Sequence, residues 1–139
     1  MTGARLHHVG LVVPAIAAVA QRSACQLHAA WDGQIFHDPL QNVRVSFLAG
    51  NGPDAPSVEL VEPVDNTSPV SEFLRRGGGL HHLCYEVDSL DEEMSRCRSD
   101  GRVVVKPAMP AVAFGGRRIF WTLNRERLLV EWLEREPAP

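Results

Sequence analysis

The sequence contains few cysteines, no hydrophobic segment long enough to span a membrane and no long run of like charges. Its three cysteines, Cys25, Cys84 and Cys97, lie far apart and form no C-x-x-C motif. An odd number of cysteines in a chain without an export signal favours reduced thiols in the cytoplasm. We therefore expect each cysteine to be a small buried hydrophobic residue.

The other absences argue against two kinds of partner. No apolar run approaches the ~20 residues that a membrane-spanning helix needs. The apolar segment 5–20 carries a histidine pair and a proline, which is not the pattern of a signal peptide. The net charge is −3, with acidic and basic residues interspersed, which argues against binding to nucleic acid or to an anionic membrane. With 45% hydrophobic and 22% charged residues among 139, the composition indicates an ordinary globular domain.

The most informative feature of the sequence is an internal repeat that contains a histidine pair. LHHV at 6–9 returns as LHHL at 80–83, 74 residues further along the chain. VELVE at 58–62 has a counterpart in VEWLE at 130–134, at a spacing of 72 residues. Each half therefore begins with a histidine-bearing segment and ends with a glutamate-bearing one. Such repetition predicts two copies of one structural module.

Both halves show the same order of predicted elements, namely strand, helix and three strands. Ser89 is the expected N-cap of the second helix and Gly101 its expected end. We predict an α+β fold made of two tandem βαβββ modules in one domain over 1–139. Module one covers 5–66, a connecting helix 67–79 and module two 80–136. The predicted strands are 6–13, 31–36, 43–49, 57–62, 80–87, 102–106, 117–123 and 127–134, the helices lie within 14–30 and 88–101, and the loops are 49–57 and 107–116.

Side-chain alternation along the two histidine-bearing strands indicates which histidine faces inward. If His8 and His82 point inward, then Gly10 and Cys84 share their face. These small neighbours leave room for a bound group, which favours the second histidine of each pair as the inward-facing one. The first histidine of each pair then has a structural role.

Two glutamates in the middle of predicted apolar strands suggest a cation. An unpaired carboxylate at Glu59 or Glu131 would be costly to bury. Together with His8 and His82 they form a candidate set of four metal ligands, and imidazole with carboxylate suits Co, Ni, Mn, Zn or Fe as a divalent ion. An ordinary histidine at a strand start is usually hydrogen-bonded or exposed, and a glutamate near a strand end is usually solvated. The repeat argues against this simpler interpretation, because it places both residue types at equivalent positions twice.

These modules, each with one histidine and one carboxylate, resemble the vicinal oxygen chelate superfamily. VELVEPVDNTSPVSEFLRRGGGLHHLCYEVDSLDEE, at 58–93, is similar to the middle section of methylmalonyl-CoA epimerases, and LHHVGLVV and LLVEWLE are similar to their two ends. The resemblance implies a curved mixed sheet around a metal site, in which His8, Glu59, His82 and Glu131 bind one divalent metal ion. It also implies that Glu131 exchanges a proton with the substrate.

The segment 37–50 departs from the epimerase pattern. The epimerases carry a glutamate there that is thought to act as a second, opposing base, and Leu40 stands at the matching position. Asp38 or His37 can replace it only if the loop is shifted. Arg117 and Arg118 can bind a carboxylate or phosphate, although a solvated pair on a strand is the simpler interpretation.

The resemblance implies a metal-dependent isomerase or epimerase that works through an enolate. Its implied substrate is an acyl-CoA or carrier-protein thioester or a related dicarbonyl compound, and its implied assembly is a homodimer. Three alternatives use the same fold. A glyoxalase I-like lyase has the same four ligands, an iron(II) dioxygenase would leave Glu59 as a surplus ligand, and a non-catalytic binding protein is favoured by the leucine at Leu40.

Overall fold

Residues 3–136, the part of the chain that the computed structural model describes, contain nine strands and three α-helices. The elements fall into an N-terminal unit, residues 8–81, and a C-terminal unit, residues 3–7 and 82–136. Strands β1 (Ala4–Val12) and β6 (Gly79–Val87) contribute residues to both units. The element order confirms an α+β fold in which strand, helix and further strands occur twice.

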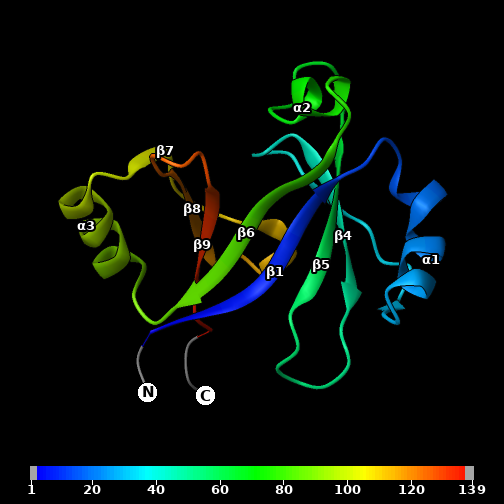
Figure 1. Cartoon of the computed structure of the whole chain (residues 1–139), viewed down its shortest axis with the longest axis horizontal. Helices are drawn as coiled ribbons and strands as arrows, with labels where there is room; N and C mark the ends of the chain where they lie inside the picture. Colours follow the sequence, from blue (N-terminus) through cyan, green and yellow to red (C-terminus); the bar gives the residue numbers. More distant parts are fainter. Residues whose placement is uncertain (1–2, 137–139) are drawn as a thin grey trace. The chain divides into compact units, whose positions relative to one another are not determined.

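The N-terminal unit builds its sheet in the order β2-β4-β5-β1, with β3 paired to β4. Strand β5 runs parallel to β1 and antiparallel to β4. Helix α1 packs beside these strands (Figure 1) through a core that includes Ile16, Ala20 and Leu60. The bounds are α1 Ile16–Gln26, β2 Ala30–Trp31, β3 Phe36–Asp38, β4 Val43–Ala49 and β5 Ser57–Pro63.

Two predictions for this unit were wrong in detail. The predicted strand 31–36 is two short strands, β2 and β3, separated by a turn in which Gln34 N–H donates to Asp32 Oδ1 and Gly33 has φ +81°. The predicted connecting helix 67–79 is only the five-residue α2 (Ser71–Arg75). The chain then turns through glycines, and Gly78 must be one of them, because a Cβ there would lie 2.8 Å from the Val12 carbonyl oxygen.

The C-terminal unit builds its sheet in the order β6-β9-β8-β7. Helix α3 begins as predicted, with the Ser89 hydroxyl accepting from Glu92 N–H, and ends at Gly101 with φ +81°. The predicted loop 107–116 was wrong at its start, because its first four residues belong to β7, which extends to Pro110. Proline is tolerated on this edge strand, whose register shifts near Lys106. The bounds are α3 Leu90–Asp100, β7 Val103–Pro110, the 3₁₀ helix Val112–Phe114, β8 Arg118–Leu123 and β9 Leu129–Glu134.

The prediction that every cysteine is buried is confirmed at two of the three positions. Cys84 and Cys97 are buried, and burial raises the pKa of the Cys97 thiol, so this thiol stays protonated at neutral pH. Cys25 is exposed, so the prediction was wrong for it. It lies outside the buried face of α1, which Ile16, Ala20 and Ala24 form.

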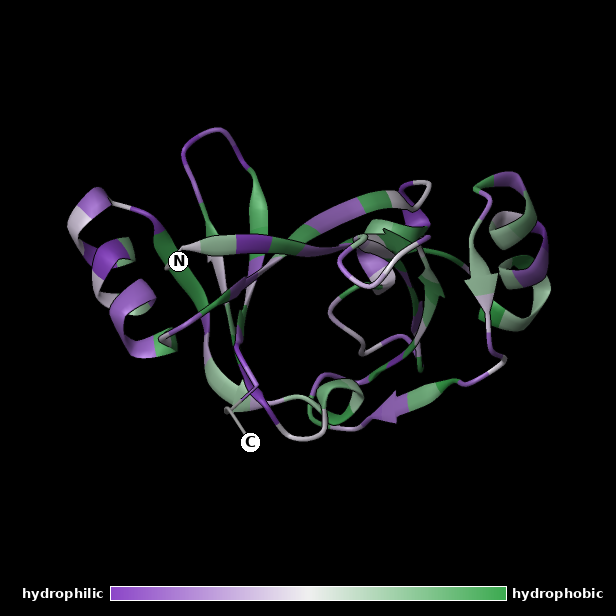
Figure 2. Cartoon of the chain, turned by 90° about the horizontal axis from the view of Figure 1, so that it is seen from below, coloured by the Kyte–Doolittle hydropathy of each residue, from purple (hydrophilic) through white to green (hydrophobic). Residues whose placement is uncertain are grey.

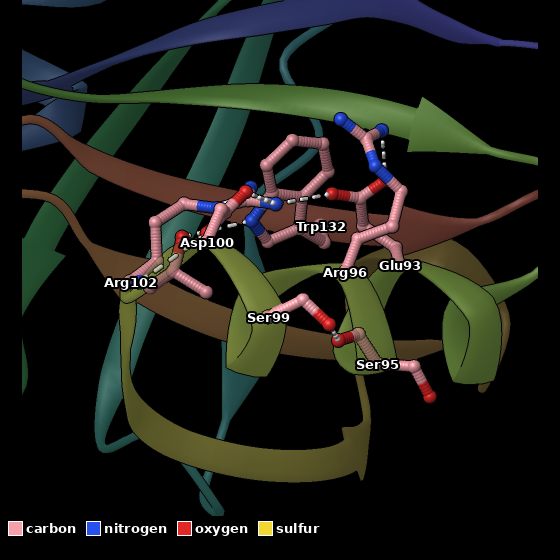
Figure 3. A network of polar contacts seen from close by, with 8 residues as sticks. Glu93, Ser95, Arg96, Ser99, Asp100, Arg102 and Trp132 are labelled. Atoms are coloured by element: carbon pink, nitrogen blue, oxygen red, sulfur yellow. Dashed lines mark hydrogen bonds and ion pairs between the residues drawn. The ribbon is translucent and has the colours of Figure 1, made fainter.

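A network of charged side chains joins helix α3 to the sheet of its unit (Figure 3). Helix α3 is largely hydrophilic (Figure 2), yet Glu93 is buried. The Glu93 carboxylate accepts from Arg102 Nη2 at 3.0 Å and from Arg96 Nη1 at 3.1 Å. The Arg102 guanidinium also lies over the Trp132 ring, 5.2 Å from its centroid. Trp132 Nε1 in turn donates to Thr122 Oγ1, so the network reaches both β9 and β8.

We expect Arg102→Ala to lower the free energy of unfolding by about 2–3 kcal/mol, because it removes a cation–π contact and one of two arginine partners of a buried carboxylate. Arg96→Ala is the matched control. Its side chain is 71% exposed and bonds the same carboxylate, so its loss should be below about 1 kcal/mol. Urea unfolding measures both, and equal losses would contradict this account of the network.

Candidate metal centre

One histidine–glutamate pair lies in the N-terminal unit. His8 on β1 and Glu59 on β5 sit on parallel neighbouring strands, with Gly10 opposite Glu59 in the register. His8 Nε2 and Glu59 Oε1 are 3.4 Å apart, and both residues are buried. Phe47 faces Glu59 from the other neighbouring strand, β4, and its ring meets the His8 ring edge-on with centroids 5.7 Å apart. The pair therefore has a small residue on one side and an aromatic wall on the other.

An equivalent pair lies in the C-terminal unit. His82 on β6 and Glu131 on β9 also sit on parallel strands, with Cys84 opposite Glu131. His82 Nε2 and Glu131 Oε1 are 3.5 Å apart, and both residues are buried. Trp121 on β8 faces Glu131 and meets the His82 ring edge-on at 4.7 Å between centroids. Each unit thus repeats the same arrangement of histidine, glutamate, small residue and aromatic ring.

Sequence reasoning missed the two aromatic walls, although a signal for them was present. Phe47 and Trp121 are 74 residues apart, the same spacing that separates the histidine pairs. Extending the repeat from the histidines would have marked both rings as equivalent positions of the two halves.

The geometry of each pair fits a metal ion. Divalent ions bind imidazole nitrogen and carboxylate oxygen at about 2.0–2.2 Å, so two ligands at 90–110° lie roughly 3.0–3.6 Å apart. The separations of 3.4 and 3.5 Å fall in this range. Imidazole with carboxylate is also a donor set that zinc, manganese, iron, cobalt and nickel accept. Each pair can therefore supply two ligands to a divalent ion.

The other histidines of the repeat pack against aromatic rings. The rings of His7 and Phe114 meet edge-on, with centroids 5.4 Å apart in the C-terminal unit. Those of His81 and Phe73 do the same at 4.9 Å in the N-terminal unit. Both arrangements agree with the structural role predicted for the first histidine of each pair.

A buried glutamate further along β6 is held by arginines. Glu86 accepts hydrogen bonds from Arg117 Nη1 at 3.0 Å and Arg5 Nη2 at 3.2 Å, and Arg135 Nε lies 3.6 Å away. Burial alone would raise the pKa of Glu86, but the hydrogen bonds from Arg117 and Arg5 outweigh it and lower this pKa. The predicted solvated arginine pair was therefore wrong for Arg117, which is mostly buried. Arg118 is more exposed and pairs with Glu134.

The segment around Leu40 forms a tight turn. Leu40 is 59% exposed. Asp38 is buried, and its carboxylate accepts from the backbone N–H groups of Leu40 and Gln41 and from Gln41 Nε2. His37 is exposed on β3. Asp38 therefore holds the turn together, and the absence of an opposing base stays a prediction.

Among residues 3–136, no helix is long and apolar enough to cross a membrane.

Comparisons with known proteins agree with this architecture. Residues 7–121 match the model of the Glyoxalase/Bleomycin resistance protein/Dioxygenase superfamily. The chain is similar to the ethylmalonyl-CoA/methylmalonyl-CoA epimerase of Cereibacter sphaeroides, with 30% identity over 119 residues that cover 84% of this chain and 86% of that protein.

Two solved structures are similar over nearly the whole chain. The methylmalonyl-CoA epimerase of Mycobacterium tuberculosis has a TM-score of 0.84 and 28% identity, covering 96% of this chain and 89% of that one. A hypothetical protein from Bacillus halodurans has a TM-score of 0.85 and 25% identity, covering 99% and 98%. These likenesses confirm the predicted vicinal oxygen chelate fold and the predicted resemblance to methylmalonyl-CoA epimerases.

We expect Glu86→Gln to lower the free energy of unfolding at pH 7 by about 2–3 kcal/mol, because it removes a buried carboxylate that several arginines surround. The pKa of Glu86 is lowered on folding, so its contribution is complete above the unfolded pKa and is lost as the pH falls through the folded pKa. The difference between wild type and variant should thus shrink below about pH 4. The exposed Glu126→Gln is the control, and a difference independent of pH would contradict the assignment.

Proposed function

Because the chain belongs to the glyoxalase/bleomycin resistance protein/dioxygenase superfamily, we propose that its two histidine–glutamate pairs bind one divalent metal ion in an epimerase-like isomerase. The proposed substrate is an acyl thioester, carried by coenzyme A or a carrier protein. The observation that carries the proposal is the buried histidine–glutamate pair, present in the same arrangement in both units. The similarity to an acyl-CoA epimerase supports the choice of reaction.

Charge and ligand number favour one shared ion over two separate ones. His8, Glu59, His82 and Glu131 form a group of residues that could hold a metal ion. One pair alone offers two ligands, whereas zinc and related ions usually take three or four from the protein. Both pairs together supply four ligands, and their two carboxylates balance the charge of a divalent ion. An octahedral ion would keep two positions for substrate oxygens, and cobalt, nickel, manganese, zinc and iron all suit this donor set.

The proposed chemistry is removal and return of a proton at a carbon between two carbonyl groups. The ion, when bound, supplies positive charge that makes this carbon more acidic. Glu131 is the proposed base, which takes the proton onto its carboxylate and returns it to the same carbon. The surrounding apolar walls, Trp121 and Phe47, would limit access of water to this proton. Inversion needs a proton donor on the opposite face. The sequence resemblance predicts that Leu40 stands in this chain where the epimerases carry their opposing glutamate.

Two further properties stay predictions from the sequence. These are assembly as a homodimer and location in the cytoplasm.

The metal content of untagged protein, measured by plasma mass spectrometry, tests the proposed centre. We expect about one divalent ion per chain, and at least about tenfold weaker binding in both Glu59→Gln and Glu131→Gln, because each removes a charged ligand. Glu126→Gln, an exposed glutamate between β8 and β9, should bind the metal as the wild type does. An empty protein that also refuses added cobalt, nickel, manganese and zinc would contradict the proposal, as would an effect confined to one of the two glutamates.

Hydrogen exchange tests the proposed reaction. In deuterium oxide, the metal-loaded protein should incorporate deuterium at the α-carbon of methylmalonyl-CoA, observed by NMR. Glu131→Gln should slow this exchange by about 10²–10⁴-fold, the usual contribution of a general base. Leu40→Glu should raise the ratio of inversion to exchange, because it places a carboxylate at the position predicted to match the opposing base.

The outcomes of the exchange experiment separate the alternatives. A protein that binds metal but exchanges no α-hydrogen across a panel of thioesters would contradict the isomerase and favour a binding protein. Loss of the absorbance of the methylglyoxal–glutathione hemithioacetal would instead identify a glyoxalase I-like lyase.

A further inference from the structure

The chain contains a single lysine, Lys106, among its 14 lysine and arginine residues. It lies in the C-terminal unit on β7, the edge strand of that sheet. The residue is half-buried, and within residues 3–136 its side chain takes part in no ion pair and no hydrogen bond. Partial burial of an ammonium group is costly unless an anion compensates its charge. Lys106 therefore has the character of a group that receives an anion from outside the chain.

Two irregularities in β7 determine the face of the sheet on which Lys106 lies. Simple alternation would give Lys106 the face of Val104 and Ala108, which pack against the core cluster that α3 shares with the sheet. The register shifts both before and after Lys106, however, and pairs it directly with Trp121 of β8. Bulges of this kind re-aim a side chain. Lys106 is therefore turned to the face that Trp121 occupies.

That face carries the His82–Glu131 pair. Trp121 lies opposite Glu131 in the pairing of β8 with β9, and its ring meets the His82 ring edge-on. Because directly opposite residues share a face, Lys106, Trp121 and Glu131 form a row across β7, β8 and β9. Neighbouring strands are about 4.8 Å apart, so roughly 10 Å separates the Cα atoms of Lys106 and Glu131. Glu131 is buried, whereas Trp121 and Lys106 are half-buried, so the row leads from the proposed metal ligand toward solvent.

Apolar side chains flank Lys106 on this face. Val103 and Met109 pair with β8 residues two positions to either side of Trp121, so they share its face. Val103 is 59% exposed, which leaves its surface open to a ligand. The row thus ends in one positive charge between two apolar side chains. A hydrogen bond from an ammonium to a carboxylate is about twice as strong as one between neutral groups.

We propose that the Lys106 ammonium binds the free carboxylate of the acyl group of a thioester substrate whose α-carbon lies beside the His82–Glu131 pair. The inference rests on the proposed function and adds a substrate-binding residue to it. Lysine suits this role, because its flexible stem carries a compact charge that can reach over the Trp121 ring. The site then favours acyl groups that carry a carboxylate over uncharged ones.

Deuterium exchange at the α-carbon, measured with N-acetylcysteamine thioesters, tests this role. Lys106→Met removes the charge, so kcat/KM with the methylmalonyl thioester should fall at least about tenfold, mainly through KM. The 2-methylacetoacetyl thioester has its α-hydrogen between two carbonyl groups but no carboxylate. Its exchange, corrected for the uncatalysed rate, should change less than about twofold. Equal loss with both thioesters, or no loss with either, would overturn the proposal.

Matched variants separate charge recognition from folding and from net charge. Lys106→Arg keeps the charge and should retain most of the exchange with the methylmalonyl thioester. Arg125→Met, at an exposed position between β8 and β9, removes the same net charge and should leave the exchange unchanged. The N-acetylcysteamine thioesters lack the phosphates of coenzyme A. A loss in Lys106→Met that appears only with methylmalonyl-CoA would therefore overturn the proposal, because it would assign the ammonium to a phosphate.

The single lysine also permits a binding measurement that needs no turnover. Reductive methylation with isotope-labelled formaldehyde marks the Lys106 amine and keeps its charge, and the signal lost in Lys106→Met identifies it by NMR. Dimethylmalonyl N-acetylcysteamine, which has no α-hydrogen, should shift this signal in the metal-loaded protein, whereas the uncharged trimethylacetyl thioester should not. A shift without any exchange of the methylmalonyl thioester would overturn the isomerase and leave the Lys106 site. Exchange without a shift would overturn the Lys106 site and leave the isomerase.

Discussion

Burial of two carboxylates beside apolar and aromatic side chains is the constraint around which both units are organised. Glu59 and Glu131 are each almost fully removed from solvent, and a buried carboxylate is costly unless a cation or donors compensate its charge. In both units the compensation begins with a histidine on the adjacent parallel strand. Parallel pairing fixes this geometry, because it places Gly10 or Cys84 directly opposite the glutamate and leaves space there.

The two units keep this arrangement and differ around it. On β1 the inward position four residues after the histidine is Val12, whereas on β6 it is Glu86 with its arginine partners. The repeated part is the one proposed to hold the metal ion, and Glu86 with its arginine partners distinguishes the C-terminal unit.

Sequence reasoning was most successful where a local pattern repeats. Alternation along β1 and β6 identified His8 and His82 as the buried histidines, and the Ser89 cap and Gly101 end of α3 follow from local backbone chemistry. It was less successful where a distant partner decides the structure. Arg117 is held at the sheet because Glu86, 31 residues earlier in the chain, accepts its hydrogen bond. No local pattern carries that information.

The central claim is that one metal ion is shared by both histidine–glutamate pairs. Counting the histidine ligands of each bound metal ion tests it most directly. X-ray absorption of the cobalt-loaded protein, with the cobalt content measured on the same sample, gives both the stoichiometry and the ligand type. A single ion shared by both pairs predicts one cobalt per chain with two imidazoles per cobalt, falling to one imidazole in His82→Ala. Two cobalt ions per chain, or one imidazole per cobalt in the wild type, would contradict the shared centre.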